Sequence, residues 1–120
     1  MIGMAVNWRT GKPRLARGAG GLSGPAIRPI ALRLSREVVE AVEIPVIGCG
    51  GISSPEDALE FLIAGATTVG VGTSLFYDPL VCGKINTGIA EYLAANGMAS
   101  VRELVGSLDA PKRKVEACSC

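Results

Sequence analysis

Two short apolar stretches that run directly into glycines constrain the fold of this chain more than any other feature. The first reads Pro45-Val46-Ile47-Gly48-Cys49-Gly50-Gly51-Ile52, and its echo reads Val69-Gly70-Val71-Gly72-Thr73-Ser74. In each, a strand-like stretch leads into a glycine turn that precedes a helix. This arrangement is typical of α/β proteins that bind phosphate through backbone N–H groups.

The helix after the first glycine turn carries clear start and stop signals. Ser54 is expected to be the N-cap, Pro55 suits the first helical position, and Asp57 stands where a capping box places its acid. A set of residues at helical spacing predicts the face that packs on the strand and the left-handed stop: Ala58, Phe61, Leu62 and Gly65.

The strands are predicted at residues 44–47, buried on both faces, and at residues 67–71. Gly72, Thr73 and Ser74 then supply backbone N–H groups and two hydroxyls. In a (β/α)8 barrel, the loops after the seventh and eighth strands form the usual phosphate site. The alternative is that these glycines only make tight turns and allow close helix packing.

A third glycine-rich loop, residues 17–25, precedes a helix of its own. Apolar residues at helical spacing predict the inner face of that helix: Ile27, Ile30, Ala31, Leu34, Val38, Ala41 and Val42. Charged residues take the remaining positions in the pattern of a solvated outer face: Arg28, Arg33, Arg36, Glu37 and Glu40. Three glycine loops therefore lie at predicted helix starts.

Alternating strands and helices favour a parallel α/β fold. An open nucleotide-binding sheet is an alternative, but no G-x-G-x-x-G follows a strand. A (β/α)8 barrel needs roughly 250 residues, whereas this chain has 120. The prediction is the C-terminal portion of a truncated TIM barrel over residues 1–110, followed by a disordered tail at 111–120.

Charge and hydropathy exclude several function classes. The net charge of +1 gives no broad footprint for nucleic acid or an anionic membrane. No stretch approaches the roughly 18 apolar residues of a membrane span, and the N-terminus does not resemble a signal peptide. A cytoplasmic location is expected.

The chain contains no histidine, so a Ser-His or Cys-His pair would need another chain. The cysteines lack the spacing of a zinc site or a disulfide framework and are expected to be free thiols: Cys49 (in a predicted turn), Cys82, Cys118 and Cys120.

The two ends of the chain are predicted more simply. Residues 7–15 read as a small hairpin, with Trp8 expected to cover an apolar edge. Residues 81–95 read as a helix that stops at Asn96-Gly97, and its inward positions are Ile85, Ile89, Tyr92 and Leu93. Ser100 and Glu103 form a capping-box pattern for a last short helix that reaches Leu108.

Four stretches carry a resemblance to a known family. They read Gly20-Gly21-Leu22-Ser23-Gly24-Pro25-Ala26-Ile27-Arg28-Pro29-Ile30-Ala31-Leu32, Ile44-Pro45-Val46-Ile47-Gly48-Cys49-Gly50-Gly51-Ile52, Ala58-Leu59-Glu60-Phe61-Leu62-Ile63-Ala64-Gly65-Ala66 and Val71-Gly72-Thr73. The chain resembles the dihydroorotate dehydrogenases, most closely the NAD-linked subtype of the cytosolic class 1 enzymes. The resemblance runs from about Met1 to Leu108 and corresponds to the last third of a family chain.

The resemblance implies an FMN-dependent oxidoreductase that converts dihydroorotate to orotate in pyrimidine synthesis. By position, the residues that match the FMN-contacting motifs are Gly24, Gly50, Gly51, Gly72 and Thr73, with Ser23 as a neighbour. It also implies a homo-oligomer and, for the NAD-linked subtype, an electron-transfer subunit that carries FAD and an iron–sulfur cluster.

The same resemblance places the family's catalytic base, flavin-side lysine and substrate asparagines upstream of Met1. No catalytic or metal-binding residue is therefore assigned, and the fragment is expected to be inactive alone. Two alternatives stay open. One is a related flavin barrel acting on another pyrimidine, and the other is a non-catalytic, phosphate-binding half-barrel.

Overall fold

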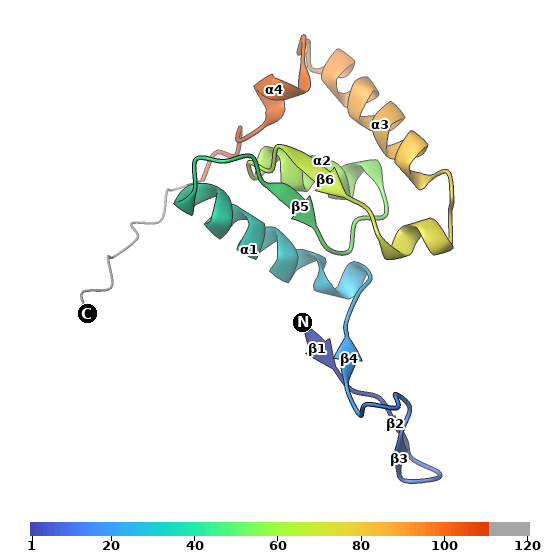
Figure 1. Cartoon of the computed structure of the whole chain (residues 1–120). Coiled ribbons are helices and arrows are strands. Elements are labelled where there is room, and N and C mark those ends of the chain that lie inside the picture. Colours follow the sequence, from blue (N-terminus) through green and yellow to red (C-terminus); the bar gives the residue numbers. More distant parts are fainter. Residues whose placement is uncertain (111–120) are drawn as a thin grey trace, which may run out of the picture.

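The computed structural model describes residues 1–110, and the predicted disordered tail at 111–120 lies outside them. The elements follow in the order β1 (Ile2–Gly3), β2 (Val6–Asn7), β3 (Lys12–Pro13), β4 (Gly20–Gly21), the 3-10 helix η1 (Pro25–Ile27), α1 (Arg28–Ala41), β5 (Ile47–Cys49), α2 (Pro55–Ile63), β6 (Thr68–Gly70), the 3-10 helix η2 (Thr73–Phe76), α3 (Val81–Ala95) and α4 (Val101–Leu104). Figure 1 shows α1, α2 and α3 grouped around the short β5–β6 pair.

The β5–α2–β6 unit is the centre of the fold. β5 and β6 pair in parallel, with Gly48 opposite Val69, and α2 connects them. The parallel α/β prediction is confirmed at this unit, since parallel strands need a crossover connection. α2 packs against β6, α1 and α3.

Two adjoining clusters of buried apolar residues form the core. The first cluster is Ile52, Ala58, Phe61, Ala66, Val81 and Ile85. The second is Leu59, Leu62 and Leu104, with Ile89, Tyr92 and Leu93 of α3 packed against it. Phe61 is fully buried, and it packs so closely on β5 that a Cβ on Gly48 would lie 2.5 Å from its ring. The predicted inner faces of α2 and α3 are thus confirmed.

Strand β5 differs from its prediction. It spans Ile47–Cys49 rather than 44–47, and only Gly48 is buried. Ile44 is 72% exposed and Ile47 is 66% exposed. Gly48 faces Phe61 of α2 and α1 also contacts the strand, but the side chains of Ile47 and Cys49 stay exposed within residues 1–110. Cys49 ends this strand rather than lying in a turn.

Helix α1 is present as predicted, but part of its predicted inner face is exposed and part of its predicted outer face contacts α2. Apolar residues of the predicted inner strip are exposed at 38–47%: Ile30, Leu34, Val38 and Val42. In contrast, Arg28 and Arg36 of the predicted outer face turn toward α2, and Arg36 Nη1 donates to the carbonyl of Ala64 at 3.0 Å. Only part of the amphipathic helix therefore has a partner within residues 1–110.

The N-terminal residues form an arm that projects from the body in Figure 1. β2 and β3 make the predicted hairpin, with Val6 opposite Pro13, and β1 pairs with β4. Trp8 is 78% exposed and stacks only with the guanidinium of Arg9, 4.6 Å from its ring centre. The expectation that Trp8 covers an apolar edge is wrong for the described residues.

The C-terminal prediction needs two corrections. α4 ends at Leu104 instead of 108, and Ser100 makes no side-chain cap. The Glu103 carboxylate accepts a hydrogen bond from the backbone N–H of Ala99 at 3.1 Å instead. The segment after α4 is joined to the end of α2 by main-chain hydrogen bonds from Gly106 to Leu62 and from Leu108 to Ile63.

Candidate functional site

The three glycine loops meet around one cavity of about 130 Å³. We call them the first (residues 17–25), second (residues 48–54) and third (residues 70–74) glycine loops. The cavity is lined by Ser23, Gly24, Ile27, Cys49, Gly50, Gly51, Ile52, Gly70, Gly72, Thr73 and Ser74. All five predicted cofactor-binding residues line it, as does Ser23, although they are separated by up to about two fifths of the chain. Their role in binding a cofactor stays a prediction.

The glycines of the second loop are explained by the way the loops pack on each other. Gly51 has φ +73°, and a Cβ there would lie 2.7 Å from the carbonyl oxygen of Gly24. At Gly50, a Cβ would lie 2.6 Å from the Cβ of Ala31. Packing of the loops on each other therefore accounts for the absence of a side chain at these two positions. The role of their backbone N–H groups stays a prediction.

Gly72 is different, because a Cβ there would meet nothing within 4 Å. No packing contact in residues 1–110 therefore explains the missing side chain. Open space beside a cavity wall is what close approach of a ligand to the backbone requires.

Several hydrogen-bond donors at the cavity have no protein partner among the described residues. Within residues 1–110, the backbone N–H groups of Gly51, Gly72 and Thr73 make no hydrogen bond, nor do the hydroxyls of Thr73 and Ser23. Such clusters of neutral donors are suited to a phosphate group. The arrangement can thus bind an anion without a cationic side chain.

The N-terminus of α2 is not one of these donors. Ser54 caps it by accepting from the N–H of Asp57 at 3.3 Å, and the reciprocal bond of the capping box is present. Glu56 and Asp57 place two carboxylates in the first turn, and the pKa of Glu56 is lowered mainly by hydrogen bonding from the Ser54 side chain. The capping-box prediction is confirmed, and an anion is therefore better placed at the loops than at this helix end.

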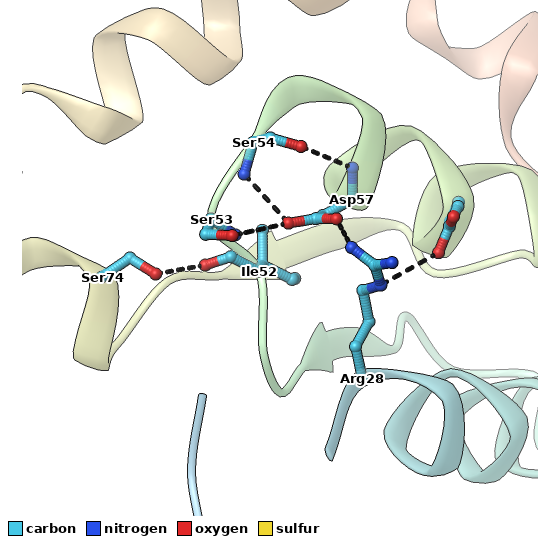
Figure 2. Close-up of polar contacts among 7 residues, drawn as sticks. Arg28, Ile52, Ser53, Ser54, Asp57 and Ser74 are labelled. Carbon is cyan, nitrogen blue, oxygen red and sulfur yellow. Dashed lines mark hydrogen bonds and ion pairs between the residues drawn. The ribbon is translucent and has the colours of Figure 1, made fainter. Parts of the chain in front are cut away.

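Asp57 forms the most connected polar cluster of the described chain (Figure 2). It is only 4% exposed, and its Oδ2 accepts from Ser53 N at 2.8 Å, Ser53 Oγ at 2.9 Å and Ser54 N at 3.1 Å. Its Oδ1 forms an ion pair with Nη1 of Arg28. Arg28 Nε also approaches Glu60 Oε2 at 3.4 Å.

A second link joins the second and third glycine loops. The Ser74 hydroxyl donates to the carbonyl oxygen of Ile52 at 2.7 Å, as Figure 2 shows. Sequence reasoning missed both this bond and the Arg28–Asp57 pair. Ser74 carries no signal for a main-chain acceptor, and Arg28 sits in a charge pattern that also suits a solvated face.

The cysteines add no chemistry to the site that the structure supports. Cys49 lines the cavity edge and Cys82 lies in the first turn of α3, and both are exposed free thiols. The predicted thiols at 118 and 120 lie outside the described residues. In the described part of the chain, no three His, Cys, Asp or Glu side chains are grouped so that they could bind a metal ion.

Larger hollows lie elsewhere. Two of about 540 Å³ each lie along α3, and two beside α1 differ in character from the cavity. One of about 560 Å³ lies between α1 and α2 and is lined by apolar residues such as Leu32 and Ile63 together with ion-paired side chains. The other, of about 380 Å³, follows the uncovered apolar strip of α1 beside β5. Neither gathers unpaired donors, so the smaller cavity is the better candidate site.

Among residues 1–110, no helix combines the length and the apolar character needed to cross a membrane.

Comparison with known proteins gives a consistent set of relatives. Residues 1–93 match the family model for dihydroorotate dehydrogenase. The catalytic subunit of dihydroorotate dehydrogenase B (NAD(+)) from Bacillus pumilus is 52% identical over 106 residues, which are 88% of this chain and 34% of that protein. The corresponding protein of Geotalea daltonii is 52% identical over 108 residues, 90% of this chain and 35% of that protein.

A solved structure agrees with the sequence matches. The ligand-free DHODH of Eimeria tenella superposes with a TM-score of 0.71 at 27% identity, covering 77% of this chain and 26% of that one. The chain spans about a third of the length of the curated relatives it matches.

Proposed function

The chain belongs to the dihydroorotate dehydrogenase family, and on that premise we propose that it forms the phosphate-binding edge of an FMN-containing (β/α)8 barrel. The activity of such a barrel is the oxidation of dihydroorotate to orotate in pyrimidine biosynthesis. We propose that residues 1–110 contribute cofactor binding to this reaction and not its catalytic base.

The convergence of the three glycine loops on one cavity is the observation that carries this proposal. Whole ligand pockets typically measure about 300–1,000 Å³, whereas this cavity measures about 130 Å³. The size suits the phosphate end of FMN, while the flavin ring would lie beyond the described residues. The unpaired donors of Gly51, Gly72 and Thr73 fit a phosphate in chemistry as well.

The barrel architecture is supported by the uncovered face of β5. In a (β/α)8 barrel, alternate strand residues point toward the helices and toward the interior. Gly48 packs on Phe61 of α2, so Ile47 and Cys49 point the other way, where a barrel has its interior. On this proposal, Ile47 is 66% exposed because the side chains that would cover it in the barrel interior belong to other segments of the barrel.

The roles of this chain's residues in the reaction follow from that placement. Bound FMN supplies the ring that accepts the two electrons removed from dihydroorotate. Gly24, Gly51, Gly72 and Thr73 would hold the phosphate end and thereby orient the ring, with Gly50 shaping the second loop. Positioning of this kind lowers the entropic part of a reaction barrier.

A direct test compares two flavins that differ only in phosphate. We would express the 120-residue chain, together with a chimaera in which its 106 matched residues replace the corresponding segment of the Bacillus pumilus protein. The chimaera should retain FMN, bind riboflavin at least tenfold more weakly, and oxidise dihydroorotate.

Three other results of this experiment would contradict the proposal or favour an alternative. Equal affinity for FMN and riboflavin contradicts the phosphate assignment. Retention of FMN without dihydroorotate oxidation favours a flavin barrel acting on another pyrimidine. Tight binding of inorganic phosphate without either flavin favours the non-catalytic half-barrel.

We also propose that the functional protein is a homo-oligomer that works with an electron-transfer subunit carrying FAD and an iron–sulfur cluster. The support is the uncovered apolar strip of α1 together with the exposed arm, since large exposed apolar surfaces mark contact regions. Sedimentation of the chimaera with and without the Bacillus pumilus partner subunit tests this. A monomer that binds no partner would contradict it.

A further inference from the structure

We propose that Arg28 and Asp57 are positioning residues that hold the three glycine loops in register around the cavity. The inference rests on the proposed function in one respect, namely that the cavity receives a phosphate. Its structural part, the coupling of the loops through a partly buried ion pair, stands on the geometry alone.

Asp57 fixes the second glycine loop from within α2. Its Oδ2 accepts three hydrogen bonds, two from backbone N–H groups of Ser53 and Ser54 and one from the Ser53 hydroxyl. A capping box requires only one of these bonds. The carboxylate therefore holds the loop as well as the helix start.

Arg28 connects this anchor to the first glycine loop. It is the first residue of α1, directly after η1, and its guanidinium reaches across to Asp57 Oδ1. The backbones are in contact at the same place, because a Cβ on Gly51 would lie 2.7 Å from Gly24 O and 3.0 Å from Arg28 Cβ. The ion pair thus closes the first loop onto the second.

Ser74 extends the same set of contacts to the third loop. Its hydroxyl donates to Ile52 O, and Ile52 is 3% exposed and precedes Ser53 in the chain. All three walls of the cavity are therefore joined through the segment 51–54 (Figure 2).

The same contacts pair the positive charge of Arg28 with carboxylates outside the cavity. The guanidinium interacts with Asp57 and Glu60, so the cavity keeps neutral donors. Asp57 is the buried member of the pair, with a side chain 5% exposed, whereas the Arg28 side chain is 33% exposed. Loss of the Asp57 charge weakens the pair with Arg28 and the hydrogen bonds from Ser53 and Ser54 together. Removal of the Asp57 charge is thus expected to loosen loops that Asp57 does not touch.

The test is Asp57→Asn, read by amide hydrogen exchange without flavin. The probes are three hydrogen-bonded amides: Ile27, which donates to Gly24, Leu75, which donates to Gly72, and Gly106, which donates to Leu62 far from the cavity. The 120-residue chain is used first, and the chimaera is used if that chain shows no protected amides. Glu60→Gln is the matched control, because Glu60 also approaches Arg28 but contacts no loop and its side chain is 46% exposed.

We expect exchange at Ile27 and Leu75 to rise at least tenfold in Asp57→Asn and less than threefold in Glu60→Gln, with Gly106 unchanged. Faster exchange confined to Ser53 and Ser54 would show a local cap and overturn the coupling, as would equal acceleration at Gly106. If Asp57→Asn does not fold, Arg28→Gln removes the other, partly exposed partner of the pair and should raise exchange at Ile27 and Leu75. No change at these two amides would overturn the coupling.

The phosphate part is tested separately by flavin titration of the chimaera. Loss of loop register should weaken FMN binding at least tenfold in Asp57→Asn and leave riboflavin binding within twofold, whereas general destabilisation would lower both. Unchanged FMN binding overturns the positioning role. If wild-type chimaera binds no FMN, the proposed function fails, while the exchange result still decides the coupling.

Discussion

Replacing Gly51 with alanine is expected to destabilise the fold and open the cavity together. Gly51 has φ +73°, and the new Cβ would lie 2.7 Å from the carbonyl oxygen of Gly24. The left-handed backbone costs a non-glycine residue about 1–2 kcal/mol. Overpacking adds about 1–3 kcal/mol when the neighbour is not free to move, and here the neighbour is backbone.

The two terms give a loss of about 3 kcal/mol in the free energy of unfolding for Gly51→Ala. For a domain of this size, such a loss lowers Tm by about 10 °C. Relief of the contact requires the first loop to move away from the second, so FMN affinity should fall with stability. Thermal melts by circular dichroism and flavin titration of the chimaera measure the two effects.

Gly83→Ala is the control, because the same replacement of glycine by alanine is expected there to raise stability instead of lowering it. Gly83 lies in α3, and a Cβ there meets nothing within 4 Å. Alanine at such an exposed helical position should stabilise by about 0.5–1 kcal/mol. A Tm for Gly51→Ala within 2 °C of wild type would refute the reasoning about backbone contact between the loops, whatever the control shows.

Three further outcomes test the packing and the electrostatics. Gly88→Ala should lower Tm despite the better helix propensity of alanine, because its Cβ would lie 2.4 Å from Pro55, and a rise as in Gly83→Ala would contradict the contact between α3 and α2. Phe61→Ala should cost about 3–5 kcal/mol in urea unfolding, since Phe61 is fully buried, and a loss below 1 kcal/mol would place the core elsewhere. The pKa of Asp78 is lowered mainly by a hydrogen bond from Lys84, so its stabilisation is complete above about pH 4 and is lost as the pH falls through the lowered value. Asp78→Asn should therefore reduce the loss of unfolding free energy as the pH falls. An unchanged dependence of this free energy on pH in the acid range would contradict the stabilising role of the Asp78–Lys84 pair.

The parts predicted well from the sequence are those that local chemistry determines. The capping box of Ser54 and Asp57 involves residues three positions apart, and α3 is bounded by Val81 and Ala95 as predicted. The left-handed stop at Gly65, with φ +113°, depends on one residue type. Each of these signals is complete within a few residues.

The misses share a physical cause, which is dependence on distant partners. The strip that contains Leu34 and Val38 shows that one face of α1 is apolar, but periodicity does not say what covers it. The Arg28–Asp57 pair joins residues far apart in sequence, so charge patterning within one helix gave the wrong face for Arg28. A phosphate site at the second and third glycine loops was predicted from the barrel pattern, whereas the first loop was predicted only to precede a helix.

The compact connection between β5 and β6 has a consequence for the order of folding. Ile47 pairs with Thr68, and most of the intervening chain is α2, so closing this loop costs little conformational entropy. We expect residues 47–70 to be the folding nucleus, with high φ-values for Ala66 and Val69 and low ones in the arm, and the reverse pattern would contradict this. The second glycine loop would then take shape in the earliest structure, and folding would spread from the middle of the chain toward both ends.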